Sequence, residues 1–312
     1  MKASVAKTLS IASLIVTASA QRIVLTNDDG WAVAQLRDEY NMLTAAGYEV
    51  ILSAPAVNQS GTGNKTTTPT PLTSACQFDT CPTGSPATGT DPNDPNIHYV
   101  NGFPVDAVRS GIQNFAEARW GSKPDFVISG SNVGSNLGSG IVGSGTVGAA
   151  GEAAIEGIPS FAFSGASGSS VSYTTLTSDP NGSSTVSANV YSSLILKFLS
   201  TYLSGGSATP IVPSGFTINI NFSLTGSCGN SVNKFKWIAT RLVRSTSGVD
   251  TTRCGTNNLP DETTVSILGD ILGSISGCVA TVSVIDANTK ADAPAAAQKA
   301  VFDRLDSILT CI

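Results

Sequence analysis

The stretch that decides the fold is Arg22–Gly30, which reads RIVLTNDDG. Its apolar run Ile23–Leu25 is typical of a buried central strand, and the run stops abruptly at polar residues. Two adjacent carboxylates, Asp28 and Asp29, follow at the point where a parallel strand delivers side chains to the ligand-binding edge of a sheet. Because paired carboxylates repel each other and are costly to desolvate, they indicate a site for a cation.

Residues 1–20 have the pattern of a secretory signal. A basic start precedes the short apolar run Leu9–Val16, and Ala18–Ala20 supplies a small-residue cleavage site. That run is too short to span a bilayer, and no other stretch is long and apolar enough to do so. We therefore expect a secreted, extracellular protein with no membrane partner, whose mature chain (21–312) begins with the strand that carries the carboxylates.

The composition limits the classes of partner. The net charge is −5, the isoelectric point is near 4.8, and no basic stripe is visible, so a nucleic acid polymer is not expected to bind. Only 12% of the residues are charged, and glycans could contribute to solubility. Sequons for such glycans stand at four positions: Asn58, Asn64, Asn181 and Asn221.

Six cysteines in a secreted chain indicate three disulfides. Cys76 and Cys81 are close enough in sequence to form a local loop. For the other four, chain order alone suggests Cys228–Cys254 and Cys278–Cys311, which is one of several connectivities that remain open.

Apolar strands alternate with amphipathic helices through the first half of the chain, which predicts an α/β fold with a right-handed, mostly parallel sheet. The expected strands are Glu49–Ala54, Ile97–Val100, Asp125–Ile128 and Ser160–Ser164, and the expected helices are Ala32–Ala46, Val105–Phe115 and Thr146–Glu156. After residue 165 we expect a C-terminal extension with a helix at Val186–Leu203, strands at Phe216–Phe222, Lys234–Val243 and Cys278–Ile285, and a terminal helix at Pro294–Leu309. Residues 64–96 have little periodicity and are interpreted as a surface excursion.

Several kinds of chemistry are excluded by what the chain lacks. His98 is the single histidine, so a zinc site or a histidine-based transfer has too few ligands or bases. Paired cysteines are poor nucleophiles, and there is no G-x-x-x-x-G-K-[ST] loop. Residues 138–143 match G-x-G-x-x-G, but they do not directly follow a strand, so a dinucleotide-dependent oxidoreductase is not expected.

Oxygen ligands remain at the ends of three expected strands. Asp28 and Asp29 follow the first strand, Ser60 follows the second, and Asn132 follows Asp125–Ile128. Such ligands suit Mg²⁺ or Mn²⁺, with Ca²⁺ as another ion that could bind there.

An anion site is expected beside these ligands. The expected third helix begins at the sequence Ser144–Thr146, and a helix N-terminus with free amides and hydroxyls attracts anions. A divalent ion next to an anion site predicts phosphate chemistry.

The chain resembles the SurE family of metal-dependent phosphatases and nucleotidases, in particular its secreted acid phosphatase branch. The motifs that carry the resemblance are Thr26–Gly30 (TNDDG), Asn58–Gly61 (NQSG), Gly102–Asp106 (GFPVD), Ser129–Gly138 (SGSNVGSNLG), Ser144–Ala150 (SGTVGAA) and Gly157–Ser160 (GIPS). Weaker matches continue at Ile218–Asn221, Thr240–Leu242 and Val282–Val284. Gly143 stands where the family usually has a tyrosine.

The resemblance implies a Rossmann-like three-layer sandwich over residues 21–165, continued by an extension over 166–312. It implies catalytic roles for Asp28 and Asp29, a divalent ion held by Asp28, Asp29, Ser60 and Asn132, and phosphate contacts from Asn136, Ser144, Gly145 and Thr146. It also implies hydrolysis of small phosphate monoesters, including nucleoside monophosphates, and often a homodimer that exchanges C-terminal elements.

We therefore expect a secreted, metal-dependent phosphomonoesterase. The nucleophile stays open between an activated water and Asp28, since carboxylates also serve as nucleophiles. A non-catalytic metal- or ligand-binding protein on the same fold is the alternative.

Overall fold

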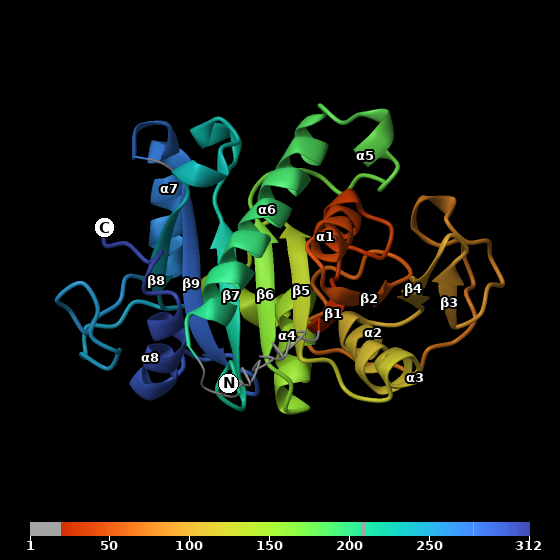
Figure 1. Cartoon of the computed structure of the whole chain (residues 1–312), viewed down its shortest axis with the longest axis horizontal. Helices are drawn as coiled ribbons and strands as arrows, with labels where there is room; N and C mark the ends of the chain where they lie inside the picture. The colour runs from red at the N-terminus through yellow and green to blue at the C-terminus, as the bar shows by residue number, and fades with distance from the viewer. Residues whose placement is uncertain (1–19, 207–209, 277) are drawn as a thin grey trace, which may run out of the picture.

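The computed structural model describes residues 20–206, 210–276 and 278–312, so nearly all of the expected signal segment lies outside the described residues. Its centre is a sheet with the strand order β3-β4-β2-β1-β5-β6-β7-β9-β8. All neighbouring strands run parallel except β3 with β4 and β7 with β9. The strand that carries the carboxylates, β1, is paired on both sides and lies well inside the sheet (Figure 1).

The strands span the following ranges: β1 Arg22–Thr26, β2 Glu49–Pro55, β3 Thr88–Asp91, β4 Asp94–Val100, β5 Phe126–Val133, β6 Ser160–Gly165, β7 Phe216–Phe222, β8 Lys236–Thr240 and β9 Val279–Asp286. The α-helices span α1 Ala34–Ala45, α2 Pro104–Ser110, α3 Ala116–Trp120, α4 Gly145–Ile155, α5 Thr175–Ser178, α6 Ser183–Ser204, α7 Glu262–Ser276 and α8 Ala295–Arg304. A π-helical turn, Gly111–Phe115, joins α2 to α3, and 3₁₀ turns cover Gln77–Asp79, Gly138–Gly143, Gly226–Cys228 and Val232–Lys234.

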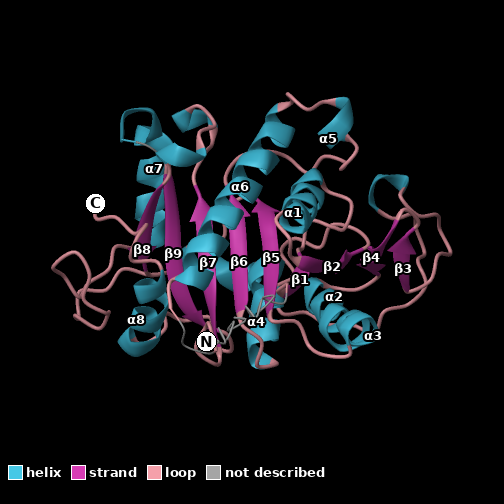
Figure 2. Ribbon diagram, viewed as in Figure 1, coloured by secondary structure: helices cyan, strands magenta, loops and turns pink. Residues whose placement is uncertain are grey.

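Helices cover both faces of the sheet and complete the expected three layers. Because successive side chains of a strand point to opposite faces, Ile23 and Leu25 pack in one core with α1, α6 and α8, whereas Val24 packs in a second core with α2 and α4. Figure 2 shows α6 crossing in front of the sheet. No helix in the described part of the chain is long and apolar enough to cross a membrane.

The expected α/β architecture is confirmed, and most expected strands and helices are found within a few residues. Three elements were missed: the short helix α5, strand β3 and helix α7. Strand β3 makes a short hairpin with β4 inside the 64–96 excursion. Helix α7 was not among the expected elements, and it contains Gly269 in its interior. A Cβ at Gly269 would lie 2.4 Å from Cγ2 of Val279, so this glycine lets α7 approach β9 closely.

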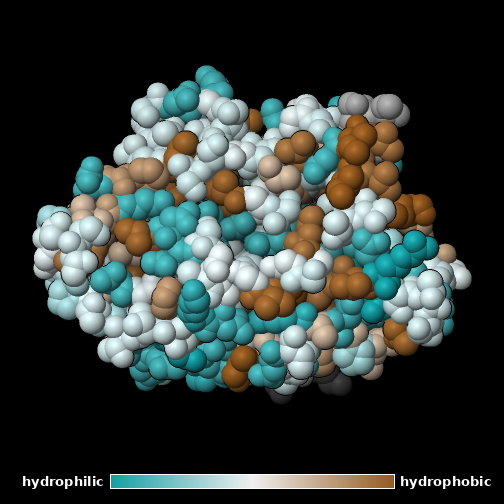
Figure 3. All heavy atoms as spheres, turned by 180° about the vertical axis from the view of Figure 1, so that it is seen from behind, coloured by the Kyte–Doolittle hydropathy of each residue, from teal (hydrophilic) through white to brown (hydrophobic). Residues whose placement is uncertain are grey.

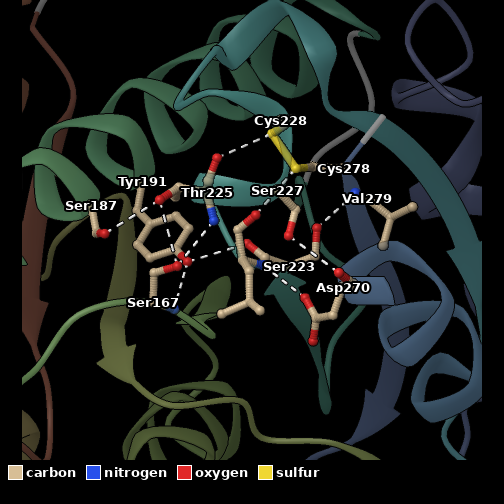
Figure 4. The surroundings of a disulfide bond; sticks show 11 residues. Ser167, Ser187, Tyr191, Ser223, Thr225, Ser227, Cys228, Asp270, Cys278 and Val279 are labelled. Carbon is tan, nitrogen blue, oxygen red and sulfur yellow. Dashed lines mark hydrogen bonds between the residues drawn. A yellow bond between two sulfur atoms is a disulfide. The ribbon is translucent and has the colours of Figure 1, made fainter. Parts of the chain in front are cut away.

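The three disulfides only partly follow the expected pairing. Cys76–Cys81 is confirmed, but the other pairs are Cys228–Cys278 and Cys254–Cys311, so the assignment by chain order was wrong. The fold explains the difference, because the neighbouring antiparallel strands β7 and β9 bring the segment after β7 next to the start of β9. Figure 4 shows Cys228–Cys278 among hydroxyl groups, where Ser223 Oγ accepts the Val279 amide at 2.9 Å.

Removing the Cys228–Cys278 disulfide should destabilise the protein more than removing the local one. Its cysteines are 50 residues apart, whereas those of Cys76–Cys81 are 5 apart, and a longer closed loop restricts the unfolded chain more. We expect Cys228→Ala/Cys278→Ala to lower the free energy of unfolding by about 2 to 4 kcal/mol in urea titrations. An equal or larger loss for Cys76→Ala/Cys81→Ala would contradict this.

Candidate metal and phosphate site

The turn after β1 presents the two carboxylates. The Asn27 side chain closes the turn, because its Nδ2 donates to the Gly30 carbonyl and its Oδ1 accepts the Gly30 amide, both at 3.2 Å. Gly30 has φ +110°, and a Cβ there would lie 2.2 Å from Oε1 of Gln77. The positive φ favours glycine at this position, and the end of the Gln77 side chain occupies the space beside it.

Asp28 and Asp29 are both almost fully buried, with 2% of each residue exposed. Burial raises the pKa of Asp28 above its ordinary value. For Asp29, burial first and the charge of Asp28 second raise the pKa to about 7. No lysine, arginine or histidine among the described residues forms an ion pair with either carboxylate. This donor set fits a hard divalent cation, which would neutralise both carboxylates.

The first turn of α4 lies directly against Asp28. Thr146 Oγ1 donates to Asp28 Oδ1 at 2.7 Å, and a Cβ at Gly145 would lie 2.8 Å from the Cβ of Asp28. Ser144 is the N-cap of this helix, since its Oγ accepts the amide of Val147 at 3.1 Å. The expected phosphate-binding residues 144–146 are thus brought beside the carboxylates.

The loop after β5 contacts the second carboxylate. The Val133 amide donates to Asp29 Oδ2 at 2.8 Å, and Ser170 Oγ donates to Asp29 Oδ1 at 3.4 Å. The neighbouring Asn132 donates through Nδ2 to the Gly134 carbonyl at 2.6 Å. Within the described chain, its Oδ1 accepts no hydrogen bond and is a suitable ligand atom for a cation.

The loop after β2 is held next to Asp28 and to the start of α4 by backbone hydrogen bonds. The Gln59 amide donates to the Asp28 carbonyl at 2.7 Å, and the Gly63 amide donates to the Gly143 carbonyl just before α4 at 3.0 Å. Ser60 lies next to Gln59 and is exposed. Its side chain makes no hydrogen bond to the other expected ligands in the part of the chain described, so the loop is placed at the site but a role for Ser60 stays a prediction.

Asn136 is held at a different point from the residues of α4. Its Nδ2 donates to Ser164 Oγ at 2.8 Å, and its backbone is bound by the side chains of Asn219 and Asn221 on β7. No hydrogen bond in the described part of the structure joins Asn136 to residues 144–146. Its phosphate contact therefore stays a prediction.

The sequence reasoning missed a set of supporting residues in the C-terminal extension. Glu262, at the start of α7, is fully buried and accepts the Gly138 amide at 2.8 Å and the Ser283 hydroxyl at 2.7 Å. Asn219 donates to both oxygens of the same carboxylate. Asn221 is also fully buried and bound in this network, which leaves no room for a glycan at that sequon.

The residues for which the sequence analysis excluded a catalytic or dinucleotide-binding role have ordinary structural roles. His98 Nδ1 lies 3.0 Å from Thr90 Oγ1, and its ring stacks on Phe115. The G-x-G-x-x-G match at 138–143 is a 3₁₀ turn that precedes α4. A cavity of about 740 Å³ near the C-terminus is lined by residues such as Arg244, Leu259 and Leu309 and includes none of the expected site residues.

Comparison with known proteins finds one family model and several relatives. The model described as "Survival protein SurE" matches residues 23–250. An acid phosphatase from Yarrowia lipolytica is 33% identical over 304 residues, which cover 88% of this chain and 81% of the relative. A 5′-nucleotidase SurE from Lawsonia intracellularis is 40% identical over 142 residues, so the match spans about half of each protein (46% of this chain and 50% of the relative).

Among solved structures, the crystal structure of the SurE protein from Aquifex aeolicus has a TM-score of 0.56 at 22% identity. The match covers 86% of this chain and 94% of that one. At this identity the likeness establishes a shared fold.

The buried Glu262 should make the stability of the protein depend on pH. Burial is the largest cause that raises its pKa from 4.5 to about 8, so between these values the folded state holds a proton that the unfolded state releases. The free energy of unfolding should therefore fall as the pH rises from about 5 to 8. Glu262→Gln should flatten this dependence by up to about 1.4 kcal/mol per pH unit in urea titrations. The exposed Glu117→Gln serves as the control, and parallel curves for wild type and Glu262→Gln would refute the assignment.

Proposed function

Because the chain belongs to the SurE family, we propose that it is a secreted phosphomonoesterase of the acid phosphatase and 5′-nucleotidase type that requires a divalent metal ion. The observation that carries the proposal is the pair of buried carboxylates next to the N-terminus of α4. The acid phosphatase relative, which matches along most of both chains, supports a small phosphorylated substrate.

The ion would be held by Asp28 and Asp29, with Asn132 and Ser60 as further oxygen ligands. Carboxylate, amide and hydroxyl oxygens suit Mg²⁺ or Mn²⁺, and Ca²⁺ could also bind there. When bound, such an ion supplies Lewis acid chemistry that polarises a phosphoryl group.

The residues of the chain then have separate tasks. The backbone amides of Gly145 and Thr146 at the start of α4 bind oxygens of the phosphoryl group, where charge builds up during the reaction. The Thr146 hydroxyl donates its proton to Asp28 and holds that carboxylate in place. Asp29, held by Val133 and Ser170, stays fixed relative to Asp28. The nucleophile is either water or Asp28, and isolation of a phosphorylated Asp28 after an acid quench would decide for the carboxylate.

The alternative hypothesis is a non-catalytic binding protein on the same fold. An assay of a generic aryl phosphate with and without a chelator distinguishes the two hypotheses. Turnover that the chelator removes, and that Mg²⁺ or Mn²⁺ restores, is expected of the enzyme.

Secretion and a homodimer are also part of the proposal. The small-residue cleavage site Ala18–Ala20 supports secretion. An apolar surface supports a second copy as partner, and its residues are Leu224, Ile267, Leu268, Ile271 and Leu272, each at least 38% exposed. Figure 3 shows hydrophobic atoms gathered over the α7 region of the molecule.

Asp28→Asn and Asp29→Asn should each reduce aryl phosphate turnover by more than about 100-fold. The uncharged asparagine side chain that replaces the carboxylate cannot neutralise a cation. Their free energies of unfolding should be equal to or above that of the wild type, since each removes a buried carboxyl whose pKa burial raises. Turnover and urea unfolding measured on the same preparations check both statements.

Asp38→Asn is the matched control, because Asp38 is also buried but does not contact the site. It should retain turnover. Wild-type turnover in Asp28→Asn would show that the site is assigned wrongly.

A further inference from the structure

Strand β5 carries a bulge immediately before Asn132. Ser129 pairs with Ala162 on β6, and Asn132 pairs with Ser164, so three steps along β5 match two along β6. Gly130 in this bulge has φ +120°, and a Cβ there would lie 2.1 Å from the Phe163 carbonyl oxygen. A bulge leaves one residue out of the ladder and turns the following side chain to a new direction.

The residue left out of the ladder finds a hydrogen-bond acceptor in a distant helix. The Ser131 amide donates to Oε2 of Glu39 on α1 at 2.9 Å, across 92 residues of sequence. Without this carboxylate, the buried amide of Ser131 would be left without its acceptor, which is destabilising.

Packing alone does not explain a glutamate at this position. Glu39 is fully buried, and its Oε1 has no hydrogen-bond partner. It forms no ion pair with any described residue. Burying a carboxylate with so few partners is costly, whereas the neighbouring core positions Leu36 and Leu43 of α1 are apolar.

The hydrogen bonds of residues 131 and 133 hold the segment between two carboxylates. The Ser131 amide binds Glu39, and the Val133 amide binds Asp29 at 2.8 Å. Asn132 lies between these two fixed points. Its amide oxygen is the one that the proposed function assigns to the metal ion.

We propose that Glu39 is a positioning residue that fixes the direction of Asn132 toward the metal ion by closing the β5 bulge. The inference rests on the proposed function. It adds a residue of α1, which packs on the face of the sheet opposite to α4, to the residues that support the site. Groups that hydrogen-bond a metal ligand change metal affinity by about 10- to 100-fold when they are removed. Glu39 acts one step further out, through the Ser131 amide, so the lower end of this range is expected.

Two substitutions with side chains about as long as glutamate distinguish the loss of the hydrogen-bond acceptor from a change in packing. Glu39→Gln keeps an oxygen that can accept the Ser131 amide, whereas Glu39→Met fills the same space without an acceptor. Mn²⁺ binding to the metal-free proteins, followed by electron paramagnetic resonance, gives a readout that does not depend on turnover. Aryl phosphate kinetics over a range of Mn²⁺ concentrations and urea unfolding accompany it. Asp38→Leu, which removes the adjacent buried carboxylate, is the control.

The expected result is Mn²⁺ binding that is weaker by about 10-fold or more in Glu39→Met, and close to the wild type in Glu39→Gln and in Asp38→Leu. Part of the lost turnover of Glu39→Met should return at high Mn²⁺. If Glu39→Met does not fold, Glu39→Asp replaces it, because the shorter side chain withdraws the carboxylate from the Ser131 amide, and the same weakening is expected.

Equal Mn²⁺ affinity in Glu39→Met and the wild type would overturn the positioning role while leaving the proposed function intact. The same holds if Glu39→Gln binds as weakly as Glu39→Met. A wild type that binds no Mn²⁺ and shows no chelator-sensitive turnover would instead overturn the proposed function, and this inference with it.

Discussion

The burial of two adjacent carboxylates at the end of β1 is the constraint on which the site depends. Asp28 and Asp29 share one turn, and no described basic side chain neutralises them. The surrounding structure fixes them instead, through the Thr146 hydroxyl on one and the Val133 amide on the other. Burial raises the pKa of both carboxyls, and in the proposed function a bound cation would offset the cost of keeping them charged. The proposed function assigns a cation to this place for that reason.

The C-terminal extension belongs to the same physical unit as the strands that carry the site. Strand β7 pairs in parallel with β6, so the sheet continues without a break from one part of the chain to the other. The side chains of Asn219 and Asn221 hold the backbone of Asn136, and Glu262 holds the Gly138 amide. The loop after β5 is therefore anchored from the extension as well as from α1.

Much of the fold could be predicted because its signals are local. The apolar run of β1, the alternation in β7 and the polar turn at Asp28 are each visible within a few residues. The resemblance to a family then linked separate motifs to one site. The missed features depend on contacts between distant residues, such as Glu39 with Ser131 across 92 positions and Glu262 with Gly138 across 124. Neither hydrophobic periodicity nor a sequence motif indicates which buried backbone amide will need a side-chain acceptor from a distant part of the chain.

The most direct test of the account is the anomalous diffraction signal of Mn²⁺ in crystals of the protein soaked with the ion. We expect one strong peak within coordination distance of carboxylate oxygens of both Asp28 and Asp29, with the Asn132 amide oxygen facing it. The absence of a peak between the two carboxylates, or a peak bound only elsewhere on the molecule, would contradict it.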